Sequence, residues 1–454
     1  MKNFRFTHFI LFLISISVFE RASAQLTLSG QLRTRSEFRD GQGGPLPKES
    51  KPAFFTSQRT RLSLGYSMYR LKFNITAQDT RVWGQDISTI NRTTTQDNNG
   101  FLLHEAWAEI LLTDTALLKK QSLSLKLGRQ ELLYDDSRLL GNLDWLQQGR
   151  RHDAAVLKYE TPSWTLHVAA AFNQNKENSA GTVFNSTPLG NYTANTNGGV
   201  MYKSMQFLYA GKKLSKGTVS FLFFTDQFSK FHNDTLNSLP AKSFETGTWT
   251  RMTSGIYFNN VFDKLTTTAS AYYQFGKNSN GQNLNACLLS AAAQYAVTKK
   301  LSAGAGVDFT SGGNGTTSKT FDPLYGTPHK FWGGMDYFYA ASGFGKGGLV
   351  DYYVKSKLKF TDKYNLAAEL HRFTSAATVV VPAAFTGSKK YFGSELDVIA
   401  AAAITRQISV EGGYSHFFGR PLLATATVKN VSNADLNSNW AYVMINIKPD
   451  FLFK

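Results

Sequence analysis

The chain has a single cysteine, Cys287, among its 454 residues, so a disulfide within the chain is impossible. Beyond residue 24 it has no apolar run near the 18 residues that a membrane-spanning helix needs. Its histidines lack the paired spacing of a metal site, and the nucleophile motif Gly-x-Ser-x-Gly is missing. These absences argue against a disulfide scaffold and a helical membrane protein. We expect no enzyme activity, no cofactor and no metal.

The first 24 residues have the three parts of an export signal. Lys2 and Arg5 supply the basic start, and Phe9–Phe19 is an apolar core too short to span a bilayer. Ala22-Ser23-Ala24 forms a small-residue cleavage site. We expect a signal peptide at 1–24 and one domain at 25–454.

The chain is basic, with 49 Lys and Arg against 32 Asp and Glu and a formal net charge of +17. The charge is dispersed along the chain, whereas nucleic-acid-binding proteins cluster it. An exported protein of this charge is better matched to an extracytoplasmic polyanion than to nucleic acid.

The rest of the chain alternates apolar and polar residues in about 18 segments of about ten residues. This rhythm is typical of an all-β, membrane-spanning, antiparallel up-and-down β-barrel, whose closure leaves no unpaired edge. Aromatic residues make up 14% of the chain, as interfacial girdles require. The expected strands are Gln25–Asp40, a second around Ser57–Met68, Leu71–Trp83, Phe101–Leu112, Ser122–Leu133, Arg151–Glu160, Trp164–Asn173, Tyr202–Lys212, Gly217–Phe228, Trp249–Asn259, Leu265–Gly276, Leu284–Val297, Leu301–Thr310, Leu349–Thr361, Tyr364–Ser375, Tyr391–Thr405, Ile408–Gly419 and Asn439–Pro449.

The connections alternate between short and long. Tight turns such as Tyr69-Arg70 and Thr161-Pro162-Ser163 are expected on the periplasmic side. The long polar segments Asn173–Met201, Ser229–Thr248 and Ser311–Gly348 are expected outside the cell. Loops of this length are usually functional or disordered, so at least one is a candidate to fold into the lumen.

Period-two alternation decides which side chains face the lumen. In the first two strands, Leu28, Leu32 and Leu62 share the lipid face, while Arg33, Arg35, Arg59 and Arg61 share the other. Lys72 and Lys126 are expected farther round the wall. Alternation does not place Arg81, Arg129, Glu131 and Arg151 on the luminal face of their strands. Either a bulge shifts the phase, or these side chains sit above the hydrocarbon band.

The inward arginines predict an anion-selective pore. Guanidinium stays charged and binds carboxylate or phosphate through a bidentate fork. Acidic neighbours such as Glu37, Asp79, Glu105 and Glu109 would keep the attraction weak enough for release. The alternative is that these charges pair with each other and merely make the lumen polar.

Five stretches resemble the alginate export family of outer-membrane proteins. They are Gln78–Gly84, Gly128–Leu132, Tyr134–Gly141, Asp144-Trp145 and Gly149–Ala154, in the expected order. The likeness is dense from about Gln25 to Tyr159 and architectural beyond it.

The resemblance implies an 18-stranded monomeric barrel whose arginine-lined constriction passes a linear polyuronate through the outer membrane. It also implies that six motif residues lie near the conduit: Asp79, Arg81, Arg129, Glu131, Arg138 and Arg151. The last match is open by one position, because Arg150 and Arg151 are adjacent. An alternative is that these residues pin extracellular loops to the barrel rim without touching solute.

The partners expected are therefore an acidic polysaccharide or another anionic solute, and outer-membrane lipid. Periplasmic export partners are left open. Two rival functions remain at this stage. One is a general anion or phosphate porin for nutrient uptake, and the other is a plugged barrel that acts as a surface adhesin or scaffold through its long loops.

Overall fold

A computed structural model describes residues 25–86, 95–96, 101–114, 120–173, 202–236, 239–313, 315–338 and 346–452. The predicted signal peptide lies outside these residues, as does most of the predicted loop Asn173–Met201. Among the described residues, no helix is long and apolar enough to cross a bilayer.

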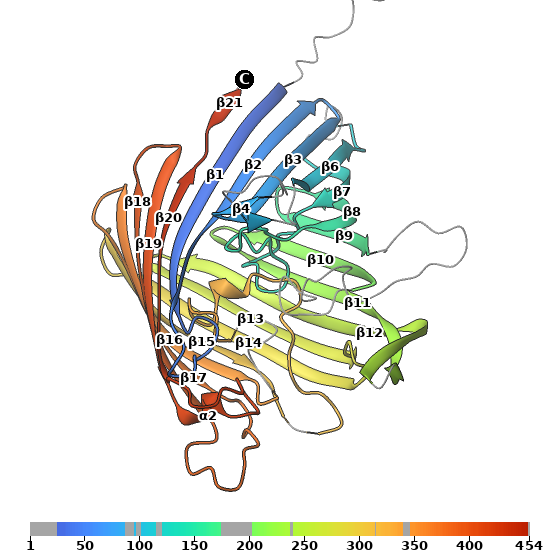
Figure 1. Ribbon diagram of the computed structural model, residues 1–454. Coiled ribbons are helices and arrows are strands. Elements are labelled where there is room, and N and C mark those ends of the chain that lie inside the picture. The colour runs from blue at the N-terminus through green and yellow to red at the C-terminus, as the bar shows by residue number, and fades with distance from the viewer. Residues whose placement is uncertain are drawn as a thin grey trace, which may run out of the picture.

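The described chain forms one closed antiparallel β-barrel of 18 long strands, which confirms the predicted fold (Figure 1). Closure comes from the pairing of the first strand with the last long strand and with the short strand after it. The barrel strands are β1 (Gln25–Asp40), β2 (Ala53–Met68), β3 (Leu71–Val82), β6 (Leu102–Leu111), β7 (Ser122–Gln130), β8 (His152–Glu160), β9 (Trp164–Phe172), β10 (Ser204–Leu214), β11 (Gly217–Leu236), β12 (Leu239–Phe262), β13 (Leu265–Lys277), β14 (Asn283–Ala296), β15 (Leu301–Thr310), β16 (Leu349–Lys359), β17 (Tyr364–Thr374), β18 (Tyr391–Ala403), β19 (Ile408–Gly419), β20 (Asn437–Ile447) and the short β21 (Asp450–Leu452).

The remaining elements are short. β4 (Gln85–Asp86) and β5 (Thr95–Gln96) form a small parallel pair. A 3₁₀ turn, η1 (Pro328–Lys330), and a single helical turn, α2 (Pro421–Ala424), lie in two of the long connections.

Alternation along the strands separates a lipid face from a luminal face. Leu32 and Leu62 are 36% and 49% exposed, whereas Arg33 and Arg59, which pair across β1 and β2, are 3% and 1% exposed. Exposed aromatic side chains occur near both ends of the strands, as interfacial girdles do. Near the tight turns these are Tyr69, Trp164, Phe262, Tyr295, Phe360 and Tyr364, and near the long connections they are Phe54, Trp83, Phe101 and Phe172.

Both ends of the described chain lie at the tight-turn end of the barrel, where β21 runs beside the start of β1 (Figure 1). By the usual orientation of such barrels, this is the periplasmic end.

One predicted loop is wrong. The segment Ser229–Thr248 continues β11 and β12 as a paired hairpin that projects beyond its neighbours (Figure 1). A register shift near Ser229 resets the pairing, and Phe231 then packs edge-on against Phe244 and Trp249. The polar composition of this segment marks a solvated hairpin, not an irregular loop.

Candidate functional site: a lumen narrowed by two inward loops

The connection between β7 and β8, residues 131–151, folds into the lumen and covers the arginines of β1 and β2. Arg33 donates to the carbonyl oxygens of Asp144, Trp145 and Leu146 at 2.7–3.2 Å. Arg35 donates to the Trp145 carbonyl at 2.7 Å. These two guanidinium groups therefore hold the loop against the barrel wall.

Asp144 brings a carboxylate into this arginine cluster, which we define as Arg33, Arg35, Arg59 and Arg61. Its oxygens lie 2.8 Å from Arg59, 3.3 Å from Arg33 and 3.8 Å from Arg61. Burial alone would raise the pKa of Asp144, but Arg59 and Arg33 outweigh it and hold that pKa below its usual range. The cluster is thus arranged to bind a carboxylate, and the chain supplies one itself.

The other side of the cluster is closed by Glu37 and Trp145. Arg35 donates to Glu37 at 2.8 Å, and Arg39 lies 2.9 Å from the second Glu37 oxygen. The Arg35 guanidinium also lies over the Trp145 indole, 4.1 Å from its centre. Of the four predicted pore arginines, Arg33, Arg35 and Arg59 are buried, and the Arg61 side chain keeps 13% of its exposure.

Two further predicted residues fasten the 131–151 loop. Glu131 accepts from Asn142 within the loop and pairs with His104 of β6, each at 2.8 Å. Arg138 reaches across to β14 and β15, where it contacts Asp308 at 2.8 Å and Ser290 at 3.1 Å. Asp308 and Asp136 raise the pKa of the buried Arg138 against the opposing effect of burial. Both side chains face inward and connect the 131–151 loop to the barrel strands.

The connection between β15 and β16 is the second inward segment, and its described part packs on the first. Tyr325 exchanges backbone hydrogen bonds with Leu139 and Gly141, and Arg150 donates to the Gly326 carbonyl. Tyr325 also donates its hydroxyl to Asp226 of β11 at 2.8 Å. One of the three long loops predicted as candidates, Ser311–Gly348, therefore has its described part in the lumen, whereas the 131–151 connection was not among them.

A buried ion-pair network anchors this second loop to the wall. Arg251 of β12 lies 2.6 Å from Asp226 and 3.0 Å from Asp322 of the loop. Gln274 of β13 donates to the Asp322 carbonyl at 2.7 Å. Sequence reasoning missed these groups because the partners are 25–99 residues apart and form no motif.

Three predicted conduit residues lie on the outer face instead. Asp79 pairs with the outward Thr60 of β2, so Asp79 and Arg81 both lie on the outward face of β3. Their side chains form an ion pair at 2.7 Å. Arg129 lies opposite Ala106 and Asp153 and forms a two-point contact with the Asp153 carboxylate at 2.8 Å. Pairing across the strands satisfies these charges without access to the lumen.

Arg151 belongs with this outer group. It directly precedes β8. Its pKa is lowered first by burial and then by the positive charge of Arg129, while the carboxylate of Asp153 acts in the opposite direction. A bulge does exist in β6, since Glu105 pairs with Thr76 and Leu103 with Ala77, which leaves His104 as the extra residue. It leaves the phase of Arg81 and Arg129 unchanged. For these residues the structure favours the alternative of a position at the barrel rim.

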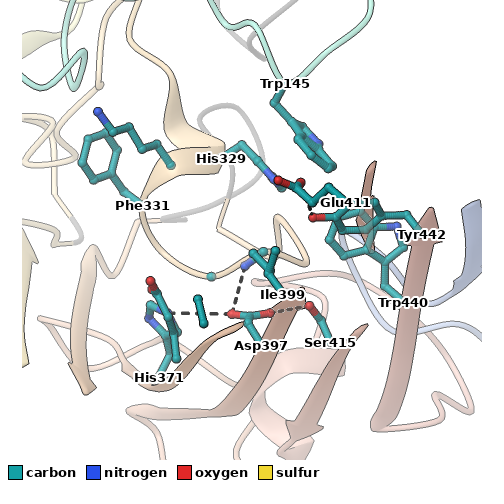
Figure 2. A pocket seen from close by; sticks show the side chains of 15 residues that line it. Trp145, His329, Phe331, His371, Asp397, Ile399, Glu411, Ser415, Trp440 and Tyr442 are labelled. Atoms are coloured by element: carbon teal, nitrogen blue, oxygen red, sulfur yellow. Dashed lines mark hydrogen bonds and ion pairs between the residues drawn. The ribbon is translucent and has the colours of Figure 1, made fainter. Parts of the chain in front are cut away.

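The wall across β16–β19 is acidic where the β1 and β2 wall is basic. His371 of β17 lies 2.9 Å from Asp351, 3.5 Å from Glu369 and 3.8 Å from Asp397. Asp397 in turn accepts from Ser415 and, at 3.3 Å, from the backbone of Gly334 (Figure 2). Alternation could have identified these inward carboxylates. They were not selected from the sequence because the one arginine of these strands, Arg372, pairs with the outward Tyr352 and faces away from the lumen.

Within the described residues, no group of three or more His, Cys, Asp or Glu side chains is arranged to hold a metal ion. The inward charged side chains described above contact one another, the two inward loops and the barrel wall.

Solved structures with the same fold are outer-membrane barrels. Pseudomonas aeruginosa OccK9 (OpdG) matches with a TM-score of 0.61 and 13% identity, over 94% of this chain and 98% of that chain. Acinetobacter baumannii OccAB4 matches with a TM-score of 0.58 and 13% identity, over 94% and 98%. P. aeruginosa OccK2 (OpdF), solved in complex with glucuronate, matches with a TM-score of 0.57 and 11% identity, over 94% and 98%. No curated protein matches the chain.

The sequence itself matches the alginate export family over residues 24–429, nearly its whole length. Family and fold together place the protein in the outer membrane and indicate a passive channel, not an enzyme. The 18-stranded barrel with its inward loops is therefore a member of the alginate export family.

Proposed function

We propose that this protein is a passive outer-membrane channel that prefers anions, and that its solutes are acidic saccharides such as alginate-like polyuronates or their oligomers. The observation that carries the proposal is the arginine cluster. Its four guanidinium groups, with Arg39 beside them, are opposed at close range by the carboxylates of Asp144, Glu37 and Glu131. Five cations against three anions leave a positive wall on one side of the lumen.

The cluster acts on a passing solute mainly through its field. Arg33, Arg35 and Arg59 lie under the 131–151 loop, so a solute meets the loop surface before their donors. Fixed charge in a narrow lumen still raises the local concentration of counter-ions. Lysines on the luminal face nearer the periplasmic end add to this field, and they include Lys72, Lys126, Lys158, Lys355 and Lys357.

Two further observations support acidic saccharides as the solute class. The cluster already holds the Asp144 carboxylate, the same group that each uronate sugar carries. OccK2, which shares the fold, was solved with glucuronate, a uronate monomer.

An adhesin or scaffold function through the β15–β16 loop is less well supported. The described residues of that loop are held inside the barrel by Arg251, Gln274 and the 131–151 loop. A general anion or phosphate porin shares the same positive wall and is separated from our proposal by solute size and chemistry.

The test is block of ion current in planar bilayers by oligouronates, with neutral oligosaccharides of equal length as the comparison. We expect block by the acidic chains at lower concentration, and a several-fold loss of that difference in Arg61→Ala. Arg129→Ala is the matched control, because it removes the same charge from the outer face. Equal block by acidic and neutral chains would contradict the proposal, and block by phosphate alone would favour the general porin.

A further inference from the structure

A cavity of about 280 Å³ lies where the two inward loops face the β17–β20 wall (Figure 2). Trp145 reaches it from the first loop and His329–Phe331 from the second. The strands contribute Glu369, Asp397, Trp440 and Tyr442 among others. The cavity lies beside the arginine cluster but is lined by different side chains.

Aromatic rings form one side of the cavity. Trp440 and Tyr442 lie 4.8 Å apart, and Tyr442 meets Trp145 edge to face at 5.0 Å. Trp145 is held between the Arg35 guanidinium at 4.1 Å and the stacked His329 ring at 4.2 Å. Since both faces of Trp145 are occupied, it acts as a rigid partition between the cluster and the cavity.

Carboxylates form the other sides, spaced apart along the wall. Glu411 accepts from the Tyr442 hydroxyl at 2.8 Å, and Asp397 accepts from Ser415 and Gly334. The Glu369 side chain keeps 42% of its exposure. An ionised carboxylate has about four acceptor positions, so each retains capacity for a hydroxyl donor.

The polar groups do not converge on one point. Glu369 and Asp397 share one cross-strand row, whereas Glu411 lies four residues farther along β19 from Ser415 of that row. The small or apolar side chains of Ala367 and Ile399 lie between them. Two cationic groups, His371 and Lys330, also line the cavity. A compact cation is bound by converging carboxylates, whereas dispersed acceptors beside aromatic carbon suit the several hydroxyls of one sugar ring.

We propose that this cavity binds one neutral pyranose ring of a saccharide, with its hydroxyls donating to Glu369, Asp397 and Glu411 and its carbon atoms toward the side lined by Trp440 and Tyr442. The volume lies just below the roughly 300–1,000 Å³ of drug-sized pockets, which fits a single ring. The inference rests on the proposed channel function, because a saccharide reaches the cavity through the lumen.

The test fills the cavity and leaves the arginine cluster untouched. Block of the full-length channel by methyl mannopyranoside is measured in planar bilayers for Ala367→Leu, with Ala368→Leu as the control. Ala367 lines the cavity, while its neighbour Ala368 points to the lipid face of the same strand. We expect at least a ten-fold weaker block in Ala367→Leu and no change in Ala368→Leu.

Two outcomes would overturn the sugar site. One is no block by the neutral sugar, or equal block in both variants. The other is that glucosamine or tetramethylammonium blocks the channel, the neutral sugar does not, and the block by the cation is lost in Glu369→Gln. That result would make the cavity a cation site. Heat-modifiable migration on gels verifies that each variant folds. The reversal potential of Ala367→Leu should equal that of the parent. A channel without anion preference, which would contradict the proposed function, is therefore distinguished from a cavity that does not bind sugar.

Discussion

At the residue scale, Asp144 sets the charge that the arginine cluster presents to the lumen. Its carboxylate contacts three arginines, yet half of its side chain remains exposed to the lumen. Asp144 therefore both fastens the 131–151 loop and offsets part of the positive field.

Replacing Asp144 with Asn removes the charge and keeps the shape. We expect the anion-to-cation permeability ratio to rise roughly two- to five-fold, because one unit charge at about 15 Å and an effective dielectric of 20 is worth on the order of 1 kcal/mol. The reversal potential under a salt gradient measures this change. A ratio that is unchanged or lower would show that the cluster does not control selectivity.

Asp135 offers a pH-dependent prediction in the same loop. Burial raises its pKa to about 6, against the hydrogen bonds that it accepts from Ser220 and Tyr209. A carboxyl whose pKa is raised on folding binds its proton more tightly when folded, so stability falls as the pH rises from about 4 to about 6.

Asp135→Asn should therefore be more stable than the parent at pH 8, by roughly 1–3 kcal/mol, and no more stable at pH 4. Its positive φ of 52° is also tolerated by Asn. The apparent melting temperature from gel migration at the two pH values provides the measurement. A gain that is equal at both pH values would refute the ionisation argument.

Alternation in the sequence predicted the inward phase of Arg33, Arg35, Arg59 and Arg61 correctly. It could not predict that a loop more than 80 residues away would cover them, because no local pattern encodes that contact. For Arg81 and Arg129, the family motif suggested the conduit while alternation placed them outside. The sequence left open whether a bulge shifts their phase or they lie at the rim, and in the structure both side chains keep the outward phase of their strands.

At the element scale, the inward loops are held by buried ion pairs at their tips. Arg138 pins the first loop to β14 and β15, and Arg251 pins the second to β11 and β12. Breaking such a pair leaves an uncompensated buried charge, so these contacts control how the loops sit in the lumen.

Arg138→Ala should free the tip of the 131–151 loop at a cost of about 3–5 kcal/mol. We expect larger and noisier single-channel currents together with a lower melting temperature. Arg129→Ala, which breaks an exposed pair worth about 0–1 kcal/mol, is the control. Identical currents in the two variants would mean that the loop does not narrow the conducting path.

Shortening the 311–348 connection tests the second loop. Since Tyr325 and Asp322 hold it against the wall and the first loop, its removal should raise single-channel conductance. Unchanged conductance with lost surface binding would instead support the adhesin alternative.

The strand count and the order of turns were predictable because each strand carries its own two-residue period. The β11–β12 hairpin was not, because its described polar residues, such as Asn233, Asp234 and Thr235, are exposed whichever face of the strand they lie on, as in a loop. The inward course of the 131–151 loop was also beyond the sequence. Its anchors Asp308, Gly326 and Gln147 make contacts that only the closed barrel brings together.

At the scale of the whole molecule, the lumen has two walls of opposite charge. β1 and β2 carry the arginine cluster, and β16–β19 carry Asp351, Glu369, Glu395 and Asp397 with His371 among them. The partition formed by Trp145 and His329 stands beside both. On this arrangement, the carboxylates of a solute are drawn to the basic wall, whereas the acidic, aromatic wall is suited to an uncharged sugar ring.

The anion preference of the lumen is tested most directly by the reversal potential of the purified full-length protein in a planar bilayer under a potassium chloride gradient. We expect a reversal potential of the sign set by chloride, reduced in Arg61→Ala and unchanged in Arg129→Ala. A reversal potential near zero, or of the sign set by potassium, would contradict this preference.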